Sequence, residues 1–434
     1  MLTTAYFLIN ITMRITVISG NTIGGTEKAA VLFACELSKR GHAVEMLTDP
    51  SGPRTASLQE AGVTIKQVGM REDDLVEYLR FAKPDIIHQH VSGYWKENPL
   101  YAALSRIEDP KPKLIETNVF GRMEDPAGKL WIERRFFVSA ASGCQAFLRS
   151  GQKMSDDALK TNLVLYNPLQ KNASITAEER SLLRRELGLG QGETLVIRVG
   201  QPGKKWRDWE LRAVQMARRR GHPVKLLVME PPASISKKIR SGTYGDGIII
   251  KPATSDFQFI ANLYQASDLM IHASDWGESY GYTIAEGMLA GLPVITISTP
   301  WGDNAQVELV ENGDSGFVCA SVPEMARRLD DLIVDPGLRQ KMGESARRRI
   351  ESISLLATET DVLEDVLREL SSGETSSRLN DRRQYLALFF KHFHDREHHF
   401  SEPAWLHPLD RFAAEAYATY RCLRSSVGQK LKNR

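Results

Sequence analysis

The regular alternation of short apolar runs with helical patterns is the feature of this sequence that most limits its fold. Runs rich in Val, Ile and Leu, such as Arg14–Ser19 and Ile86–Gln89, alternate with amphipathic segments such as Glu27–Arg40, which Gly41 ends. Because parallel strands need a long crossover, this alternation predicts right-handed βαβ units and parallel sheets. Ligands of such sheets bind beyond the carboxyl ends of the strands.

The alternation is interrupted once, which predicts two domains of the same kind. The segment Leu163–Ser174 carries a proline and small polar residues, and a helical segment and a new strand, Leu195–Val199, follow it. At roughly 150 residues per domain, 434 residues suffice for two or three domains. We therefore expect an α/β protein with two Rossmann-like, doubly wound domains that face each other across a cleft.

Composition bounds the class of protein without choosing a function. The formal charge of +2 at pH 7 gives no argument for nucleic acid, and we expect no such partner. Four cysteines lie far apart without CxxC spacing, which indicates a reducing compartment and neither zinc nor disulfides. No apolar run approaches the roughly 20 residues of a membrane span, and the first twelve residues lack the features of a signal peptide. We expect a cytoplasmic protein whose true start is Met1 or Met13.

Two stretches of the first half place flexible or polar residues where strands end. Gly24 and Gly25 lie between the first strand and a helix start, where backbone amides attract anions. The alternative is a tight turn without a ligand. His88 and His90 share one face at the end of a buried strand. They form either a polar wall of the cleft or a pair of core histidines, and the pattern leaves both open.

A basic loop follows the first strand of the second domain. Lys204, Lys205 and Arg207 come shortly after the strand that ends at Val199. A cation at this position can neutralise a phosphate bound at the carboxyl end of the sheet. The alternative is a solvated basic loop.

Two glutamates within Ser274–Ser298 give the most specific signal. Glu278 lies in a loop bracketed by glycines, and Glu286 lies about one turn inside a helix that begins near Tyr282. Apolar neighbours predict that this helix is largely buried, so its carboxylate needs hydrogen-bond donors. One carboxylate can accept from both hydroxyls of a vicinal diol, and the helix N-terminus favours a phosphate. The stretch therefore predicts a site for a sugar, a ribose and a phosphate.

These motifs together resemble a known family. GGTEKA after the first strand resembles the family's GG-x-E turn, and KPDIIHQH resembles a further landmark. Glu278 and Glu286, with seven residues between them, resemble its two-glutamate signature. Glu308, in PWGDNAQVE, resembles the glutamate that usually follows a Gly-Gly turn. Over Met13–Leu370 the chain resembles the retaining glycosyltransferases of the GT-B fold, family 4 (glycosyl transferases group 1).

The resemblance gives the domains their roles. An acceptor domain and a donor-binding domain would be followed by helices that cross back toward the first domain, and then by a basic, His-rich helical tail. The implied division is 1–12 (N-terminal extension), 13–168 (acceptor domain), 169–345 (donor-binding domain), 346–372 (returning helices) and 373–434 (tail).

The resemblance also implies roles for single residues. Glu278 would hold donor-sugar hydroxyls, Glu286 the ribose diol and Lys205 the diphosphate, so that Lys205 and Glu278 would be the catalytic residues. The rest of the donor site would be formed by Gly24, Gly25, Tyr280 and Gly281. The family usually has an arginine where this chain has Gln201, and a histidine where it has Asn118. The candidates for the missing cation are Lys204, Arg207 and Arg198. The candidates for the acceptor side are His88, His90, Asn118 and Arg122.

The implied reaction moves a hexosyl unit from a nucleotide-sugar, a UDP- or GDP-sugar, to an acceptor hydroxyl with retention at the anomeric carbon. The acceptor would be a glycan, a lipid-linked glycan or a small molecule. The chain contains no D-x-D triplet, so we expect neither a metal nor a cofactor. One alternative is a GT-B protein that binds a ligand or partner without turnover. Another is a different GT-B enzyme, either an inverting transferase or a sugar-nucleotide epimerase.

The tail lies beyond the resemblance and has its own composition. From Glu374 onward it holds 11 Lys and Arg against 7 Asp and Glu, and five of the ten histidines. His394 and His398, four residues apart, would suit a metal pair on a helix. Phe389 and Phe390 among basic residues would suit peripheral contact with the inner face of a membrane. The interpretation we favour is a helical pair packed on the main body.

Overall fold

The computed structural model describes residues 12–93, 98–121, 123, 130–200, 203, 205–254, 256–299 and 302–398, and of residues 392–398 the backbone alone. The chain forms two compact units, and each is built from separate parts of the sequence. Of the described residues, the first unit comprises those from residue 12 to Phe137, Ser150–Pro168 and Leu356–Arg383. The second unit comprises Val138–Arg149, Leu169–Leu355 and the described residues from Gln384 onward.

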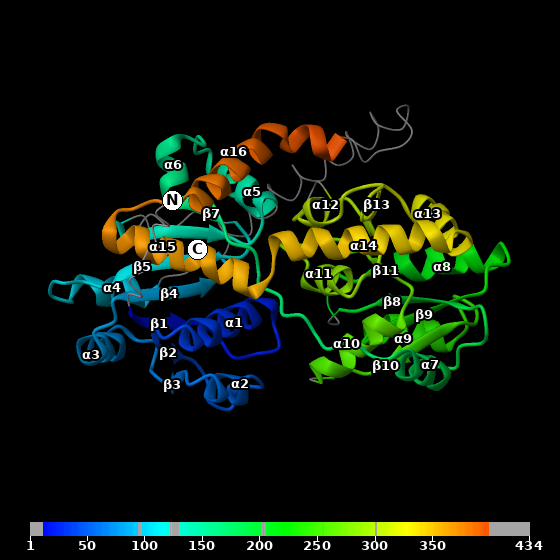
Figure 1. The fold of residues 1–434 in the computed structure, drawn as a ribbon, viewed down its shortest axis with the longest axis horizontal. Coiled ribbons are helices and arrows are strands. Elements are labelled where there is room, and N and C mark those ends of the chain that lie inside the picture. The colour runs from blue at the N-terminus through cyan, green and yellow to red at the C-terminus, as the bar shows by residue number, and fades with distance from the viewer. Residues whose placement is uncertain are drawn as a thin grey trace, which may run out of the picture. The chain divides into compact units, whose positions relative to one another are not determined.

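The first unit is built on a seven-stranded parallel sheet with the order β3-β2-β1-β4-β5-β6-β7 (Figure 1). Its strands are β1 (Arg14–Ile18), β2 (Ala43–Leu47), β3 (Thr64–Lys66), β4 (Ile86–Val91), β5 (Lys113–Asn118), β6 (Ile132–Phe137) and β7 (Asn162–Val164). Its helices are α1 (Gly25–Lys39), α2 (Thr55–Glu60), α3 (Glu72–Ala82), α4 (Pro99–Ser105), α6 (Asp156–Thr161) and α15 (Leu356–Ser372).

The second unit is built on a six-stranded parallel sheet with the order β10-β9-β8-β11-β12-β13. Its strands are β8 (Thr194–Arg198), β9 (Val224–Met229), β10 (Ile248–Lys251), β11 (Leu269–His272), β12 (Val294–Ile297) and β13 (Gly316–Cys319). Its helices are α5 (Ala140–Ser150), α7 (Ala177–Glu186), α8 (Trp209–Arg219), α9 (Ala233–Arg240), α10 (Phe257–Ala266), α11 (Tyr282–Leu289), α12 (Gln306–Leu309), α13 (Val322–Val334) and α14 (Pro336–Ile353). Helix α16 (Ser377–His398) begins in the first unit and continues into the second.

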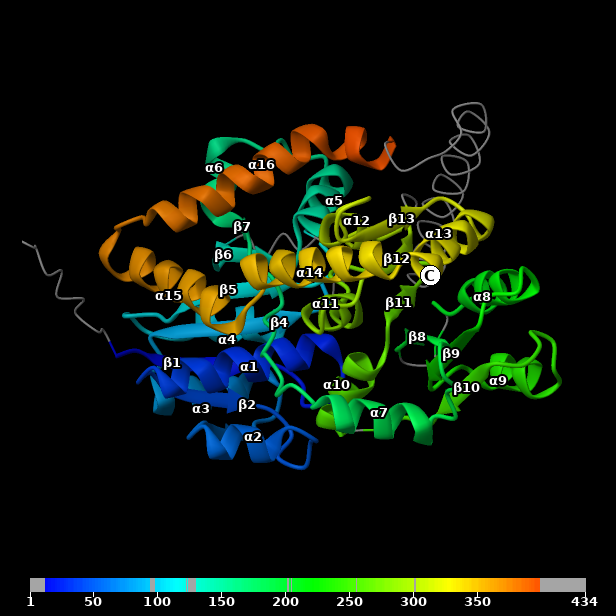
Figure 2. The ribbon, with the colours of Figure 1, turned by 45° about the vertical axis from the view of Figure 1, so that its right-hand side comes forward.

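Both sheets are doubly wound. The order within six strands of each sheet is 3-2-1-4-5-6, counted from that unit's first strand, which is the Rossmann order. In the second unit, α8 and α13 pack together over one face of the sheet (Figure 2). The strand order changes direction between β1 and β4 in one unit and between β8 and β11 in the other, and these are the topological switch points of the two sheets. Ligands of this architecture bind outside the carboxyl ends of the strands at these points.

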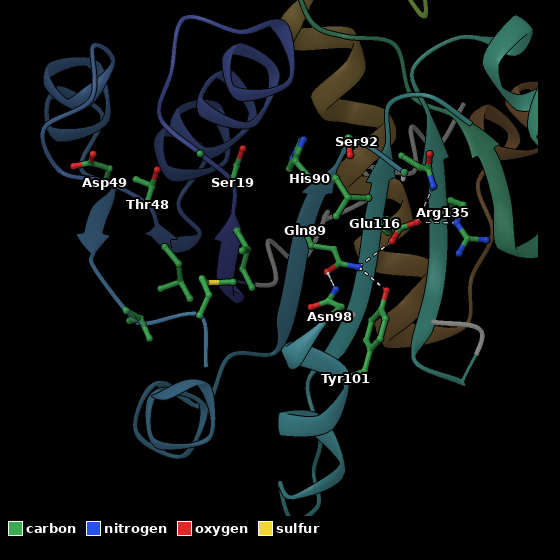
Figure 3. Close-up of a pocket in the computed structure, with 18 of the residues that line it drawn as sticks. Ser19, Thr48, Asp49, Gln89, His90, Ser92, Asn98, Tyr101, Glu116 and Arg135 are labelled. Atoms are coloured by element: carbon green, nitrogen blue, oxygen red, sulfur yellow. Dashed lines mark hydrogen bonds and ion pairs between the residues drawn. The ribbon is translucent and has the colours of Figure 1, made fainter. Parts of the chain in front are cut away.

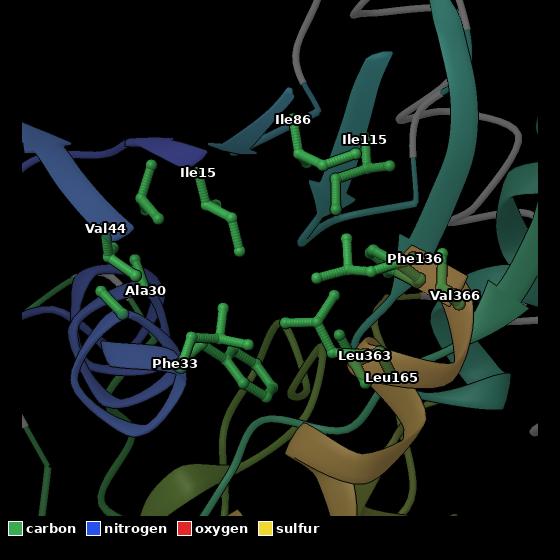
Figure 4. Packing of buried hydrophobic residues seen from close by; sticks show 14 of the residues in the cluster. Ile15, Ala30, Phe33, Val44, Ile86, Ile115, Phe136, Leu165, Leu363 and Val366 are labelled. Atoms are coloured by element: carbon green, nitrogen blue, oxygen red, sulfur yellow. The ribbon is translucent and has the colours of Figure 1, made fainter. Parts of the chain in front are cut away.

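The core of the first unit includes a helix from far along the chain. Ile15, Phe33 and Phe136 are buried together with Leu363 and Val366 of α15 (Figure 4). Burial of such side chains stabilises a fold by roughly 1.5–3 kcal/mol each. Helix α15 is therefore an integral part of the first unit, although some 220 residues separate it from β6.

The units differ from the continuous domains expected from the sequence. Residues 138–149 join the second unit, although they fall inside the expected acceptor domain 13–168. The expected linker after Ser372 is short, because α16 begins at Ser377. The expected tail 373–434 is therefore divided between the units, and its part beyond residue 398 lies outside the described residues, as does the extension before residue 12.

Candidate active site

A cavity of about 600 Å³ opens at the carboxyl ends of β1, β2, β4 and β5 in the first unit (Figure 3). It is lined by two of the residues predicted for the acceptor side, His90 and Asn118. The cavity lies where a doubly wound sheet binds its ligands. Arg122, the fourth of the predicted residues, lies outside the described residues.

A buried polar network forms one part of the cavity wall. Glu116 accepts hydrogen bonds from Gln89 Nε2 (2.9 Å) and from Arg135 Nε (2.8 Å). Gln89 also donates to the Tyr101 hydroxyl (3.2 Å) and accepts from Asn98 Nδ2 (3.0 Å), as the dashed lines of Figure 3 show. Because each member is paired, the network fixes side chains from β4, β5, β6 and α4 in one arrangement.

The two predicted histidines differ in their surroundings. The His88 side chain is fully buried, and its Nε2 atom lies 2.8 Å from Thr117 Oγ1. His90 lines the cavity, and the two rings lie 4.2 Å apart. Burial lowers the pKa of His90 to about 3 and holds that of His88 well below its usual range, so both rings are neutral at physiological pH. His88 is thus a core histidine, and His90 faces the cavity.

The predicted glycine turn begins α1. Gly24 is the N-cap of this helix, and its side-chain position is closed, because a Cβ there would lie 2.3 Å from Glu27 Oε2. Gly25 is the first helical residue. Gly24 has an ordinary φ of −62°, and a side chain there would displace only the flexible end of Glu27, so the role of this glycine toward a donor stays a prediction.

In the second unit, Lys205, Glu278 and His272 come together. Lys205 Nζ lies 3.3 Å from Glu278 Oε2 and donates to the carbonyl oxygen of Gly277 (3.0 Å). His272 Nε2 lies 3.1 Å from the other oxygen, Glu278 Oε1. Although burial alone would raise the pKa of Glu278, the charge on Lys205 and the hydrogen bond with His272 lower it to about 2. Glu278 is therefore ionised throughout the physiological range.

The loop that carries Glu278 is held by its backbone. Gly277 has a φ of +65°, and a Cβ there would lie 1.3 Å from the carbonyl oxygen of Asp303. The Glu278 amide donates to Gln306 Oε1 (3.1 Å), and the Glu278 carbonyl oxygen accepts from the Ala305 amide (2.8 Å). The loop geometry therefore requires glycine at residue 277 and places the glutamate in a fixed position.

Glu286 is a residue of α11, whose start at Tyr282 confirms the predicted helix start. The helix is N-capped by Gly281, with a φ of +97°, in the left-handed region. Four residues around the glutamate are buried: Ile284, Ala285, Gly287 and Met288. Glu286 itself is half-buried and accepts a hydrogen bond from the Tyr264 hydroxyl (3.1 Å). Tyr280 is buried, and its hydroxyl group pairs with Ser354 Oγ (2.7 Å), so only its backbone is left for the predicted donor contact.

The candidate phosphate cations have different partners. Arg198 is buried, pairs with Glu210 (3.1 Å) and stacks 3.8 Å from the ring centroid of Trp206. Arg207 pairs with Asp275. The Lys205 side chain is two-fifths exposed. Gln201 and Lys204 lie outside the described residues. Among the described candidates, Lys205 is the cation that lies beside the glutamate signature.

The sequence does not predict the contacts that Glu278, Glu286 and Glu308 make in the structure. His272 ends strand β11 and Tyr264 lies in α10, and neither carries a motif that would mark it. Glu308 was recognised by position alone. Its two carboxylate oxygens accept from the backbone amides of Ala140 (3.1 Å) and Ala141 (2.9 Å), the first residues of α5. Glu308 therefore caps a helix that begins 168 residues earlier.

Among the residues that the structure describes, no group of three His, Cys, Asp or Glu side chains is placed to hold a metal ion. The side chains of His394 and His398 lie outside this description. None of the described helices is long and apolar enough to cross a membrane.

Residues 181–349 match the family model of the glycosyl transferases group 1. The spore coat protein SA of Bacillus subtilis (strain 168) is 29% identical over 213 residues, which cover 44% of this chain and 52% of that protein. The chain thus spans about half the length of this relative. The alpha-D-kanosaminyltransferase of Streptomyces kanamyceticus is 26% identical over 299 residues, 66% of this chain and 71% of that protein.

Solved structures of glycosyltransferases share the fold. A glycosyltransferase from Rickettsia africae ESF-5 superimposes with a TM-score of 0.69 at 17% identity, covering 84% of this chain and 100% of that chain. The Anabaena protein Alr3699/HepE, in complex with UDP and glucose, gives a TM-score of 0.63 at 17% identity, covering 82% and 100%.

Two parallel doubly wound sheets with this strand order, together with these neighbours, define the GT-B fold. Within that class, the match to the glycosyl transferases group 1 model covers residues 181–349, which lie in the second unit.

Proposed function

We propose that this protein transfers a hexosyl unit from a nucleotide-sugar to an acceptor hydroxyl with retention at the anomeric carbon. The observation that carries the proposal is the cluster of Lys205, Glu278 and His272 beside the N-terminus of α11. A fixed carboxylate suits sugar hydroxyls, a neighbouring ammonium suits the diphosphate, and the amides at the helix N-terminus suit a phosphate oxygen.

Glu278 and Lys205 have different roles in the transfer. Glu278 holds hydroxyls of the donor sugar and so orients the anomeric carbon, while Lys205 stabilises the charge that develops on the leaving diphosphate. The bond between the anomeric carbon and the diphosphate oxygen breaks, and a bond to the acceptor oxygen forms on the same face of the sugar. The proton of the acceptor hydroxyl passes to the leaving phosphate oxygen. No step requires a metal ion.

The donor is a UDP- or GDP-sugar whose ribose diol binds Glu286. The Tyr264 hydroxyl group donates to this carboxylate, and a carboxylate can accept from both hydroxyls of a vicinal diol. The relation to HepE, whose structure contains UDP and glucose, favours a UDP-sugar. The acceptor binds the first unit. The transfer is a step of glycan biosynthesis in the cytoplasm.

A two-stage experiment tests the proposal. A thermal-shift screen against UDP-, GDP- and ADP-sugars identifies the donor, because a ligand that binds the folded protein raises its unfolding midpoint. Transfer and hydrolysis of that donor are then measured for the wild type and for Glu286→Ala. Full turnover by Glu286→Ala would contradict the site, and donor binding without any turnover would favour a protein that binds without catalysis.

A further inference from the structure

A buried ion pair lies at the topological switch point of the second sheet. Arg198 is the last residue of β8, Glu210 lies in the first turn of α8, and their Nε and Oε1 atoms are 3.1 Å apart. The two side chains are only 3% and 2% exposed. A guanidinium that is buried and already paired is not available to a diphosphate, so the pair needs a role other than direct contact with the donor.

The pair bonds to the chain where the ladder between β8 and β11 ends. The last backbone partners of these two strands are Ile197 and Met270. Beyond them, the amide of Ala273 donates to Glu210 Oε1 (2.8 Å), and Arg198 Nη2 lies 3.4 Å from the carbonyl oxygen of Ala273. The pair therefore holds both backbone groups of the first residue after β11.

The same guanidinium supports the loop after β8. Its Cζ atom lies 3.8 Å from the centroid of the Trp206 ring, and Trp206 is buried. A cation over the face of an indole ring is attracted by the electrons of the ring, and more so when water is excluded. Because Lys205 directly precedes Trp206, the stacked ring fixes the backbone from which the lysine side chain extends.

The loops after β8 and β11 are also bonded to each other. The amide of Asp275 donates to the carbonyl oxygen of Lys205 (3.0 Å), and Lys205 Nζ donates to the carbonyl oxygen of Gly277 (3.0 Å). Arg207 forms an ion pair with Asp275. Lys205 and Glu278 therefore lie on two loops that share one buried support.

The energetics of a buried ion pair favour a geometric role over a stabilising one. The cost of desolvating two charges offsets their attraction, so apolar side chains of similar size often stabilise a fold equally well. The hydrogen bonds of the Arg198–Glu210 pair add fixed directions, which apolar side chains lack. The charge of Arg198 also acts on the site: burial raises the pKa of Glu278, and this charge is among the causes that lower it to about 2.

We infer that the Arg198–Glu210 pair is a positioning pair, which fixes the two loops so that the Lys205 ammonium and the Glu278 carboxylate are held ready for the donor. The inference rests on the proposed function in that these two groups bind the nucleotide-sugar. Arg198 and Glu210 act through them and do not touch the donor.

The test replaces both members of the pair in the full chain. Removing one member alone would leave a buried, uncompensated charge and destabilise the fold. The paired variant, Arg198→Met with Glu210→Met, removes both charges and keeps apolar bulk, so its unfolding midpoint should stay close to that of the wild type. Calorimetric titration should show UDP and GDP binding weakened about 10-fold, and kcat/KM for the donor should fall about 10- to 100-fold. Wild-type binding and kcat/KM would overturn the inference and leave the transferase standing.

The first unit offers a matched control pair. Glu359 also pairs with an arginine, Arg382, and also accepts from a backbone amide, that of Tyr166 (2.8 Å). Arg382 likewise lies over an aromatic ring, 5.1 Å from the centroid of Tyr166. The control variant, Arg382→Met with Glu359→Met, should keep wild-type nucleotide binding and kcat/KM. Equal losses in the paired and control variants would show a general effect of removing a buried ion pair and overturn the inference.

Hydrogen exchange reads the loops directly and requires no turnover. The amide of Asp275 keeps its acceptor, the Lys205 carbonyl oxygen, in the paired variant, so it loses protection only if the loops move apart. We expect that loss in the paired variant and not in the control variant. Unchanged protection would overturn the inference. Loss of protection in a protein whose wild type turns over no nucleotide-sugar would contradict the proposed function and leave the positioning pair standing.

A double-mutant cycle tests whether the pair acts through the lysine. In the Lys205→Met background, the paired substitutions should reduce kcat/KM by a smaller factor than they do alone. Losses that multiply in full would overturn the inference.

A conservative variant covers the case in which the paired variant does not fold. Arg198→Lys keeps a charge opposite Glu210 but lacks the planar group that reaches Ala273 and stacks on Trp206. It should weaken nucleotide binding about 3-fold. Wild-type affinity together with unchanged protection of the Asp275 amide in this variant would overturn the inference.

Discussion

Lys205 and Glu278 form an ion pair in the second unit, with Nζ and Oε2 3.3 Å apart. The lysine side chain is 42% exposed and the glutamate side chain 20% exposed. A pair this open to solvent contributes little to stability, typically about 0–1 kcal/mol. It can therefore be rearranged at small cost when a ligand brings its own charge and hydroxyls. In the proposed function, the pair keeps the site organised before the donor binds.

Replacing Lys205 by methionine is expected to reduce donor turnover about 100-fold or more, because the charge developing on the leaving diphosphate loses its nearest described cation. The unfolding midpoint should change little, since the lysine side chain is 42% exposed and His272 still contacts Glu278 in the variant. Steady-state kinetics with the identified donor measure the effect. Lys237→Met, at an exposed residue of α9, is the matched control and should keep wild-type rates. Equal rates for the two variants would remove Lys205 from the mechanism.

His272 is predicted to act through Glu278 as a positioning residue. His272→Phe keeps the ring but removes the contact with Glu278 Oε1, so kcat/KM for the donor should fall about 5- to 10-fold. The decisive measurement is a double-mutant cycle with Glu278→Ala. In the Glu278→Ala background the histidine substitution should have no further effect on kcat/KM. Additive losses would show that His272 acts independently of the carboxylate.

Local sequence signals suffice to predict the elements that carry the candidate donor site. Alternating periodicity predicts the strands, and the glycine before Tyr282 predicts the start of α11, because Gly281 adopts a φ of +97° that other residues rarely take. The position of Glu278 in the loop and of Glu286 inside the helix follows from these two signals. Both signals, the strand periodicity and the glycine before Tyr282, arise within short segments, where residue propensity and turn chemistry decide the conformation.

The contacts that complete the site join distant segments, and no local pattern encodes them. Lys205 and Glu278 are 73 residues apart, and the amide of Ala140 meets Glu308 across 168 residues. The assignment of residues 138–149 to the second unit likewise depends on packing between segments, which hydrophobic periodicity does not specify.

Tyr264→Phe is expected to weaken nucleotide binding about 3- to 10-fold, because the hydroxyl group that holds Glu286 is lost. Burial and the nearby Glu286 carboxylate raise the pKa of Tyr264, so this group remains a hydrogen-bond donor at any physiological pH. Calorimetric titration with UDP and GDP measures the effect. Tyr244→Phe removes a comparable hydroxyl–carboxylate contact with Asp208 (3.0 Å) and is the matched control. The same loss in both variants would point to general destabilisation.

The lowered pKa of Glu369 predicts that the free energy of unfolding depends on pH. Burial raises its pKa, but hydrogen bonds from Arg383, Thr375 and Arg134 outweigh burial and lower the pKa to about 2 from its usual 4.5. Because the folded pKa is depressed, the stabilisation is fully present above about pH 5 and is lost as pH falls toward 2. Its size is at most about 3 kcal/mol.

The measurement for Glu369 compares unfolding midpoints of the wild type and Glu369→Gln between pH 7 and pH 3. The wild type should be more stable at pH 7, and the difference should shrink steadily below pH 4.5. A difference that stays constant across this range would show that the carboxylate charge contributes nothing.

Glu308 is expected to stabilise the start of α5 and not to titrate as a catalytic group. Its oxygens accept from the amides of Ala140 and Ala141, and its side chain is fully buried. Glu308→Gln can accept from only one of these amides, so the free energy of unfolding should fall by about 1–3 kcal/mol. Glu311→Gln, at an exposed residue nearby, is the matched control and should cost less than about 0.5 kcal/mol. Hydrogen exchange gives the local readout, since the Ala140 and Ala141 amides should lose protection in Glu308→Gln alone. Unchanged protection of both amides in this variant would mean that the carboxylate does not cap the helix, and the position would then need a role in the donor site.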